Sequence, residues 1–216
     1  MDHLDRQTDY WNKVAAEKEF THPFDCARFK TLVPVGGRVL DYGCGYGRVC
    51  EQVRDLEYSV VGVDISKEMI KRGRRYYPQV EFELITDRSL PYENESFDAV
   101  ILFAVLTCIP NDSAQRELIR EIHRVLRPGG ILYVSDYSLQ TNERNQHRYE
   151  QFEKKYGTFG VFELPDGAVL RHHSIEWIED LLSGFERIAI ESLDVPTMNW
   201  NPATIFQYFA KKTNQA

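Results

Sequence analysis

The stretch Arg38–Gly47, RVLDYGCGYG, decides the fold of this chain. It reads as a short buried strand that ends in Asp41 and runs directly into a glycine-rich loop. The next apolar segment, Val60–Asp64 (VVGVD), reads as a second buried strand that also ends in a carboxylate. A strand, a glycine loop, a helix and a second strand in this order build a nucleotide-type pocket at the carboxyl ends of parallel strands.

The spacing of the glycines indicates which ligand this pocket takes. Gly43, Gly45 and Gly47 follow Asp41 in the pattern Asp-x-Gly-x-Gly-x-Gly. A dinucleotide fingerprint instead reads Gly-x-Gly-x-x-Gly and seats a pyrophosphate on a helix N-terminus. A leading carboxylate repels a pyrophosphate but suits an amino-acid ammonium group. Asp64 stands where a carboxylate after the second strand can hold ribose hydroxyls. A ligand that has both a ribose and an amino-acid ammonium group is S-adenosylmethionine.

With these residues the chain resembles the class I S-adenosylmethionine-dependent methyltransferases, especially the small-molecule group called type 11. Leu126–Leu132 (LRPGGIL) resembles the family's Leu-x-Pro-Gly-Gly turn into the fifth strand, and Trp177–Phe185 resembles its final helix. The resemblance implies an α/β Rossmann-like three-layer sandwich with a seven-stranded, mostly parallel sheet whose last strand is antiparallel. It also implies transfer of a methyl group from S-adenosyl-L-methionine to a small-molecule nucleophile, with an O, N or S acceptor.

The alternation of apolar and amphipathic segments favours the same architecture. We expect strands at 38–42, 59–63, 80–85, 97–103, 130–136, 186–193 and 203–211, and helices at 47–55, 66–76, 112–126 and 174–183. Residues 1–216 read as a single methyltransferase domain. Its expected parts are an N-terminal lid at 1–30, a cofactor-binding core at 37–136, an acceptor-side insertion at 137–172, and a C-terminal helix and strands at 173–216.

The resemblance also implies specific contacts with the cofactor. It places Ile65 and Met69 against the adenine ring, Asp87 and the backbone of Arg88 at the adenine edge, and Phe103 at the methionine ammonium. Ile65 and Met69 equally suit helix packing, and Asp87 equally suits a turn at a strand end. The remaining expected cofactor residues are Asp41, Gly43, Cys44, Gly45 and Asp64 in the core and Tyr10 and Trp11 in the lid. Tyr10 and Trp11 equally suit a role in packing only. Arg28 is a separate candidate, as the partner of the cofactor's carboxylate.

Residues for chemistry on the acceptor are fewer. His172 and His173 precede the last expected helix, and an imidazole near its normal pKa can take a proton from an acceptor. Alternatively, one of them supports the helix start and the other packs a loop. Where the family has Leu-x-His, this chain has Leu106–Cys108 (LTC), which removes one obvious base. Asp136 and Tyr137, just past the fifth expected strand, either bind substrate or simply terminate the strand.

Composition narrows the possible partners. The 216 residues carry a net charge of −7, which disfavours binding to a phosphate backbone. The four cysteines show no C-x-x-C spacing, so we expect reduced thiols, no metal and a cytoplasmic location. We expect a small-molecule acceptor, no nucleic acid, no membrane, and a monomer or homodimer. The alternatives are a tRNA- or protein-directed methyltransferase, a non-catalytic S-adenosylmethionine-binding protein, and a nicotinamide-dependent dehydrogenase, which the glycine spacing disfavours.

Overall fold

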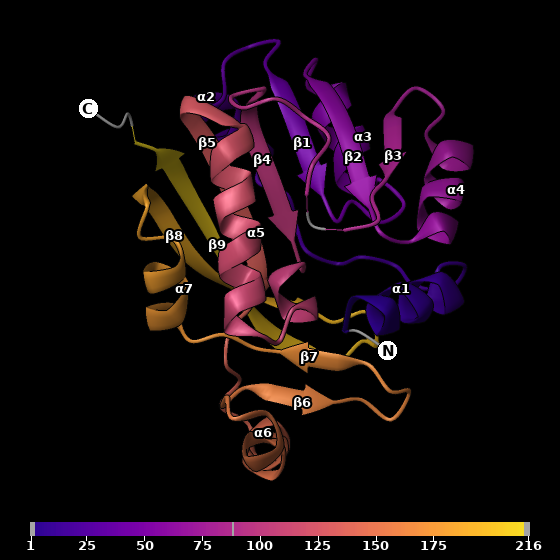
Figure 1. Ribbon diagram of the computed structural model, residues 1–216, viewed down its shortest axis with the longest axis vertical. Helices are drawn as coiled ribbons and strands as arrows, with labels where there is room; N and C mark the ends of the chain where they lie inside the picture. The colour runs from indigo at the N-terminus through magenta and orange to yellow at the C-terminus, as the bar shows by residue number, and fades with distance from the viewer. Residues whose placement is uncertain (1–2, 88, 214–216) are drawn as a thin grey trace.

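A seven-stranded sheet forms the centre of the molecule, in the order β3-β2-β1-β4-β5-β9-β8 (Figure 1). The computed structural model describes residues 3–87 and 89–213. The strands of this sheet are β1 (Arg38–Tyr42), β2 (Ser59–Asp64), β3 (Glu81–Leu84), β4 (Phe97–Phe103), β5 (Leu126–Tyr137), β8 (Phe185–Pro196) and β9 (Pro202–Lys212). Strand β9 runs antiparallel to both of its neighbours, and the other neighbouring pairs are parallel. The predicted Rossmann-like α/β sheet with an antiparallel last strand is confirmed.

Helices cover both faces of the sheet. The helices on these faces are α2 (Cys26–Leu32), α3 (Arg48–Asp55), α4 (Lys67–Tyr76), α5 (Asp112–Val125) and α7 (Ile175–Leu181). Beyond the strand ends lie α1 (His3–Val14), α6 (Glu143–Tyr156) and a short 3₁₀ turn, η1, at Leu106–Cys108. The hydroxyl of Ser66 caps α4 by accepting a hydrogen bond of 3.2 Å from the N–H of Met69. Ser174 caps α7 in the same way, so a short polar residue sets the start of each of these helices. Among the described residues, no helix is both long and apolar enough to cross a membrane.

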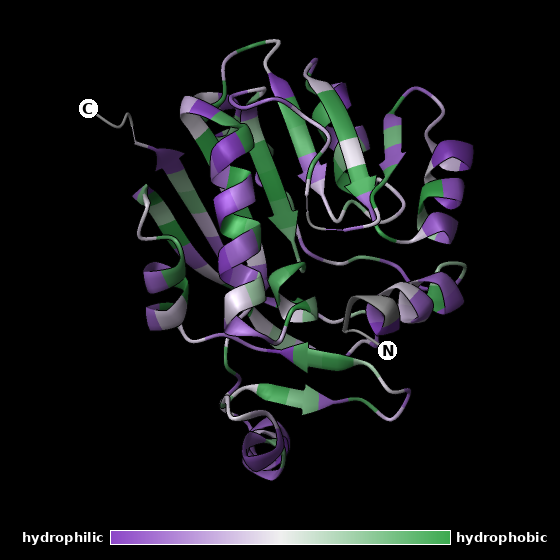
Figure 2. Ribbon diagram, viewed as in Figure 1, coloured by the Kyte–Doolittle hydropathy of each residue, from purple (hydrophilic) through white to green (hydrophobic). Residues whose placement is uncertain are grey.

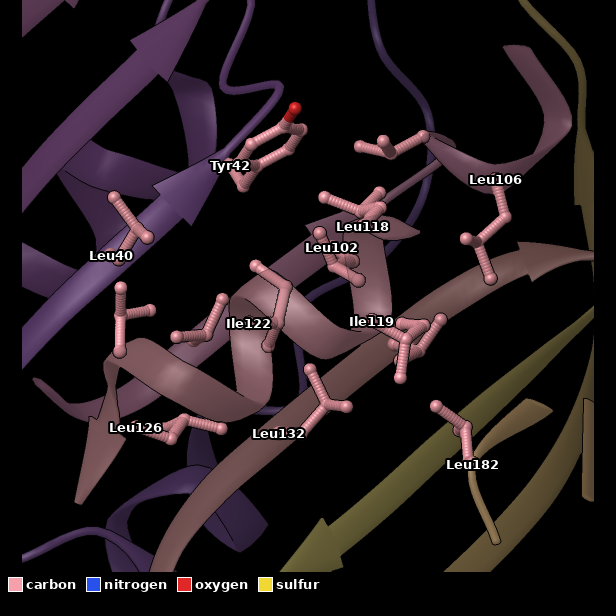
Figure 3. Close-up of a cluster of buried hydrophobic side chains, with 14 of the residues drawn as sticks. Leu40, Tyr42, Leu102, Leu106, Leu118, Ile119, Ile122, Leu126, Leu132 and Leu182 are labelled. Carbon is pink, nitrogen blue, oxygen red and sulfur yellow. The ribbon is translucent and has the colours of Figure 1, made fainter. Parts of the chain in front are cut away.

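The strands are apolar on both faces because each face is covered by helices. On β4, Val100 and Leu102 pack into the cluster under α5 and α7, whereas Ala99 and Ile101 pack into the cluster under α2 and α3. Figure 3 shows side chains of β1, α5 and β5 gathered in the first cluster. Each fully buried Leu or Ile side chain contributes about 1.5–3 kcal/mol. These two clusters keep rigid the carboxyl ends of the strands, where the site lies.

The segment 137–172 contains regular structure that our sequence analysis does not place. It forms α6 and a two-stranded sheet of β6 (Val161–Glu163) and β7 (Val169–Arg171). Figure 1 shows these elements stacked beyond the ends at which β1, β2 and β4 terminate. Helix α6 is hydrophilic over most of its surface (Figure 2), and its buried side chains are Asn145 and Tyr149. With so few apolar residues, the helix has no visible hydrophobic period in the sequence.

Candidate functional site

A cavity of about 500 Å³ lies at the carboxyl ends of β1, β2 and β4. Segments far apart in sequence line it: the glycine loop after β1, the N-terminal residues 7–22, η1, helix α6, the two-stranded sheet and the turn between β8 and β9. Most of the residues predicted from sequence meet here. They are Tyr10, Trp11, Asp41, Gly43, Cys44, Gly45, Asp64, Ile65, Met69, Phe103, Tyr137 and His172.

The glycine loop needs its glycines at two points on the cavity wall. Gly43 has φ +71° and Gly45 has φ +56°, a backbone region that residues with a Cβ rarely adopt. A Cβ on Gly45 would lie 2.1 Å from the ring of Phe20, and one on Gly43 would lie 2.6 Å from Val105. The loop is therefore pressed closely between the end of β4 and the N-terminal segment.

Asp64, the last residue of β2, presents a carboxylate whose two oxygens are both held in place. Its Oδ2 accepts a hydrogen bond of 2.8 Å from the N–H of Gly45, and its Oδ1 accepts one of 2.7 Å from the N–H of Ser66. Each carboxylate oxygen keeps a further lone pair for a ligand hydroxyl. Burial raises the pKa of Asp64 to about 6. The backbone hydrogen bonds that the carboxylate accepts lower the pKa and so offset part of the effect of burial. The group is an ordered acceptor for two neighbouring hydroxyls.

A second carboxylate and a cation lie at the same end of the cavity. Asp41 is 2% exposed and accepts a hydrogen bond of 3.1 Å from the thiol of Cys50. Burial raises the pKa of Asp41 to about 6. Arg48, in the first turn of α3, donates to the backbone carbonyl of His22 and lines the cavity. This end therefore offers both charges that an amino-acid moiety requires.

Aromatic side chains of the N-terminal segment cover the glycine loop. The ring of Phe20 stacks on that of Tyr46, with centroids 5.0 Å apart and planes within 14°. Trp11 packs edge-on against Phe20, and the guanidinium of Arg72 lies 4.0 Å from the centroid of the Tyr46 ring. Arg72 also donates hydrogen bonds of 2.8 Å to the carbonyls of Ala15 and Lys18. These contacts tie the segment to α4 above the loop.

The opposite end of the cavity is built from α6, β6, β7 and Tyr137. The ring of His172 stacks on Tyr137, with centroids 5.2 Å apart, and meets Phe162 edge-on at 4.9 Å. Nδ1 of His172 lies 2.6 Å from the hydroxyl of Tyr149. Burial, and after it the charge of Arg148, lower the pKa of His172 well below its usual value. The ring is therefore neutral at ordinary pH.

The comparison with known proteins fits this geometry. Residues 40–134 match the sequence profile of a methyltransferase domain. These residues contain the glycine loop, Asp64 and the fifth strand. Over these residues the chain is similar to a methyltransferase domain. These residues line the end of the cavity that we expect to hold the cofactor, whereas the opposite end comes mostly from elements that follow them in sequence.

Named methyltransferases are similar to this chain over part of their length. A demethylmenaquinone methyltransferase of Renibacterium salmoninarum is 36% identical over 106 residues, which cover 49% of this chain and 44% of that protein. A ubiquinone biosynthesis O-methyltransferase of Xanthomonas oryzae pv. oryzae is 31% identical over 140 residues, covering 55% of this chain and 57% of that protein. The chain thus spans about half the length of each of these relatives.

A solved structure shows the same fold over nearly the whole chain. It is that of a Methanosarcina mazei protein named a SAM-dependent methyltransferase, with a TM-score of 0.82 and 24% sequence identity. The match covers 88% of this chain and 98% of that one. The shared fold therefore extends beyond residues 40–134.

Two of the predicted acceptor-side residues do not reach the cavity. His173 is 1% exposed, its Nε2 lies 2.9 Å from the amide nitrogen of Gln115, and burial lowers its pKa to about 3. Asp136 is fully buried and accepts hydrogen bonds from the N–H groups of Thr107 and Tyr137, at 3.1 Å and 2.7 Å. The expectations of a catalytic His173 and a substrate-binding Asp136 are corrected: both side chains hold backbone and neighbouring side chains in place.

The predicted contacts at the adenine edge and at the cofactor's carboxylate also change. Asp87 is exposed, and its carboxylate accepts a hydrogen bond of 2.7 Å from the N–H of Ser89, the turn geometry that was the alternative interpretation. Arg88 lies outside the described residues. Arg28 pairs with Glu191 on β8, so Arg48 takes the place at the cavity that our sequence analysis gives to Arg28.

Several cavity residues carry no signal in the sequence. Arg148 and Phe162 come from α6 and β6, which show no hydrophobic period. Met198 and Asn199 come from the turn between β8 and β9, which reads as an ordinary loop. Phe20 and His22 stand in the run Phe20–Phe24 (FTHPF), inside the expected lid at 1–30, and they are the exception because this aromatic run is visible in the sequence.

Proposed function

We propose that this protein transfers a methyl group from S-adenosyl-L-methionine to an O, N or S atom of a small-molecule acceptor. The observation that carries the proposal is the Asp64 carboxylate, which is fixed by Gly45 and Ser66 at the wall of the cavity. A carboxylate at this place after the second strand suits the two hydroxyls of a ribose. The methyltransferase names of the relatives support the same reaction.

The residues of the cavity fit S-adenosylmethionine at each of its parts. Ile65, Met69 and Ile85 supply an apolar wall for the adenine ring. Asp64 accepts from the ribose hydroxyls, and the amino-acid end lies near Asp41 and Arg48. A pyrophosphate in the same place would meet two carboxylates, which favours this cofactor over a nicotinamide dinucleotide.

Methyl transfer requires the protein mainly to align the methyl donor with the acceptor. The sulfonium of S-adenosylmethionine makes its methyl group electrophilic. The rigid sheet edge holds the cofactor residues, while α6, β6 and β7 supply the walls that orient an acceptor. Orientation of two reactants in this way lowers a barrier by up to about 7–11 kcal/mol. Tyr137 and His172 are the residues we place beside the acceptor.

Further parts of the proposal concern the setting of the reaction. We place the protein in the cytoplasm, as a monomer or homodimer that acts without nucleic acid and without a membrane. All four cysteines are free thiols, which suits a reducing compartment. The net charge of −7 opposes a nucleic-acid substrate.

The test is calorimetric titration of the protein with S-adenosylmethionine, S-adenosylhomocysteine and NAD. We expect the first two to bind with micromolar affinity and NAD to show no binding. Asp64→Ala should weaken S-adenosylhomocysteine binding at least tenfold, because hydrogen bonds to a charged acceptor contribute about 1.5–3 kcal/mol. Asp55→Ala, which removes an exposed carboxylate at the end of α3, is the matched control. Binding of NAD alone, or equal binding by Asp64→Ala and wild type, would refute the proposal.

A further inference from the structure

The carboxylates that line the cavity are confined to one of its ends. Among the described residues that line it, the carboxylates are Asp41 and Asp64, both at the cofactor end. The acceptor end instead carries Arg144 and Arg148, one turn apart on α6. In a protein with a net charge of −7, this end of the cavity is a local cationic site.

Arg148 is half-buried, and no carboxylate among the described residues pairs with it. Its guanidinium carbon lies 3.5 Å from the centroid of the Phe162 ring, and its buried Nε has no hydrogen-bond partner in the described structure. Burial lowers the pKa of Arg148, and the charge of Arg144 adds to this effect. A cation that has lost part of its hydration in this way gains most from an anion placed beside it.

His172 completes the site as a hydrogen-bond donor. The hydroxyl of Tyr149 accepts a hydrogen bond of 3.2 Å from the N–H of Gln140 and lies 2.6 Å from Nδ1 of His172. The Tyr149 hydroxyl therefore donates its own proton to Nδ1 of His172. Because a neutral imidazole carries one ring proton, the proton of His172 then sits on Nε2. A ring fixed in this tautomer donates from Nε2 and cannot take a proton there. With this assignment His172 acts as a hydrogen-bond donor, in contrast to the general base expected from the sequence.

We propose that the methyl acceptor is an anion with an apolar ring or chain, and that its anionic group binds between the guanidinium of Arg148 and Nε2 of His172. This inference rests on the proposed methyltransferase function and specifies its substrate class. The rings of Tyr137 and Phe162 stand beside the two nitrogen donors and supply the apolar contact. A carboxylate or a phenolate has the required charge, and an acceptor already ionised needs no base.

The experiment uses benzoate and its neutral isostere benzamide as probes. Both are titrated into the wild-type protein saturated with S-adenosylhomocysteine, and binding is followed by calorimetry. We expect benzoate to bind at least tenfold more tightly than benzamide. Arg148→Met, which keeps the packing on Phe162 but removes the charge, should lose most of this preference, and Arg148→Lys should keep part of it. Arg120→Met removes an exposed arginine of α5 and is the matched control.

The outcomes separate this inference from the proposed function. Loss of the benzoate preference in Arg148→Met, with S-adenosylhomocysteine affinity unchanged, supports the anion site. Equal binding of the two probes, no binding of benzoate, or an unchanged preference in Arg148→Met overturns it and leaves the methyltransferase proposal standing. Failure of the wild-type protein to bind S-adenosylhomocysteine at all overturns both.

Discussion

The carboxylate of Asp64 accepts a hydrogen bond of 2.8 Å from the backbone N–H of Gly45, which joins the end of β2 to the glycine loop after β1. Asp64, which we propose binds the ribose, thus also fixes the glycine loop. The ionisation of Asp64 should therefore control both interactions.

Binding of S-adenosylhomocysteine should weaken in acid. Burial raises the pKa of Asp64 to about 6, and the ionised form is the better acceptor for ribose hydroxyls. Affinity is therefore full above this pKa and is lost as the pH falls through about 6. We expect a loss of about tenfold between pH 8 and pH 5 in titration calorimetry.

Two variants identify the titrating group. Asp64→Asn should bind weakly at both pH values, since its amide cannot titrate. Asp41 has a pKa that burial also raises to about 6, so Asp41→Asn measures its share of the pH dependence. An affinity that is the same at pH 5 and pH 8 in the wild-type protein would contradict this prediction.

Gly45→Ala should destabilise the protein more than Gly157→Ala. Both glycines have positive φ, +56° and +69°, so both substitutions incur a left-handed backbone cost of roughly 1–2 kcal/mol. A Cβ at position 45 also meets the ring of Phe20 at 2.1 Å, whereas nothing lies within 4 Å at position 157. Urea unfolding of the two variants measures the difference.

A double variant isolates the clash. Phe20→Ala removes the ring, so Phe20→Ala combined with Gly45→Ala should cost less than the sum of the two single variants. We expect a coupling of about 0.5–3 kcal/mol. Equal losses in Gly45→Ala and Gly157→Ala, or strict additivity in the double variant, would show that the ring does not press on the loop.

Arg72→Ala should release the N-terminal segment from the glycine loop. The guanidinium holds the carbonyls of Ala15 and Lys18, each at 2.8 Å, and covers the ring of Tyr46. Hydrogen bonds from a charged donor contribute about 1.5–3 kcal/mol, so amide hydrogen exchange over residues 15–20 should become at least tenfold faster. Arg75→Ala, which removes an exposed cation stacked on Tyr76 from the same helix, is the control and should leave exchange there unchanged.

Tyr149→Phe should free His172 to change tautomer. The Tyr149 hydroxyl lies 2.6 Å from Nδ1 of His172, and burial keeps the pKa of the ring well below its usual value. Nitrogen-15 NMR of the wild-type imidazole should report a neutral ring with its proton on Nε2 from pH 6 to 8. The variant should show a mixture of tautomers, whereas Tyr156→Phe on the same helix should not. A wild-type proton on Nδ1 would rule out the donor role of Nε2.

The residues of the proposed cofactor half of the candidate site could be predicted to meet in one place because their signals are local. The pattern from Asp41 to Gly47 places a strand end, a tight loop and a helix start within ten residues, and Asp64 closes the next strand. Such short-range geometry follows from backbone sterics and from the capping of helix ends. The order of alternating strands and helices predicted the parallel part of the sheet, whereas the antiparallel last strand was implied by the family resemblance.

Only the tertiary structure decided the acceptor half. His172 and His173 are neighbours, yet one lines the cavity and the other faces Gln115; Asp136 and Tyr137 divide in the same manner. Successive side chains of an extended chain point to opposite sides, so a shift of one residue in register exchanges their roles. The sequence by itself determined that these residues stand near the site. Only the packing of distant segments decides which residue of each pair enters the cavity. The same packing brings Arg148 and Phe162 to them, and these segments share no local sequence pattern.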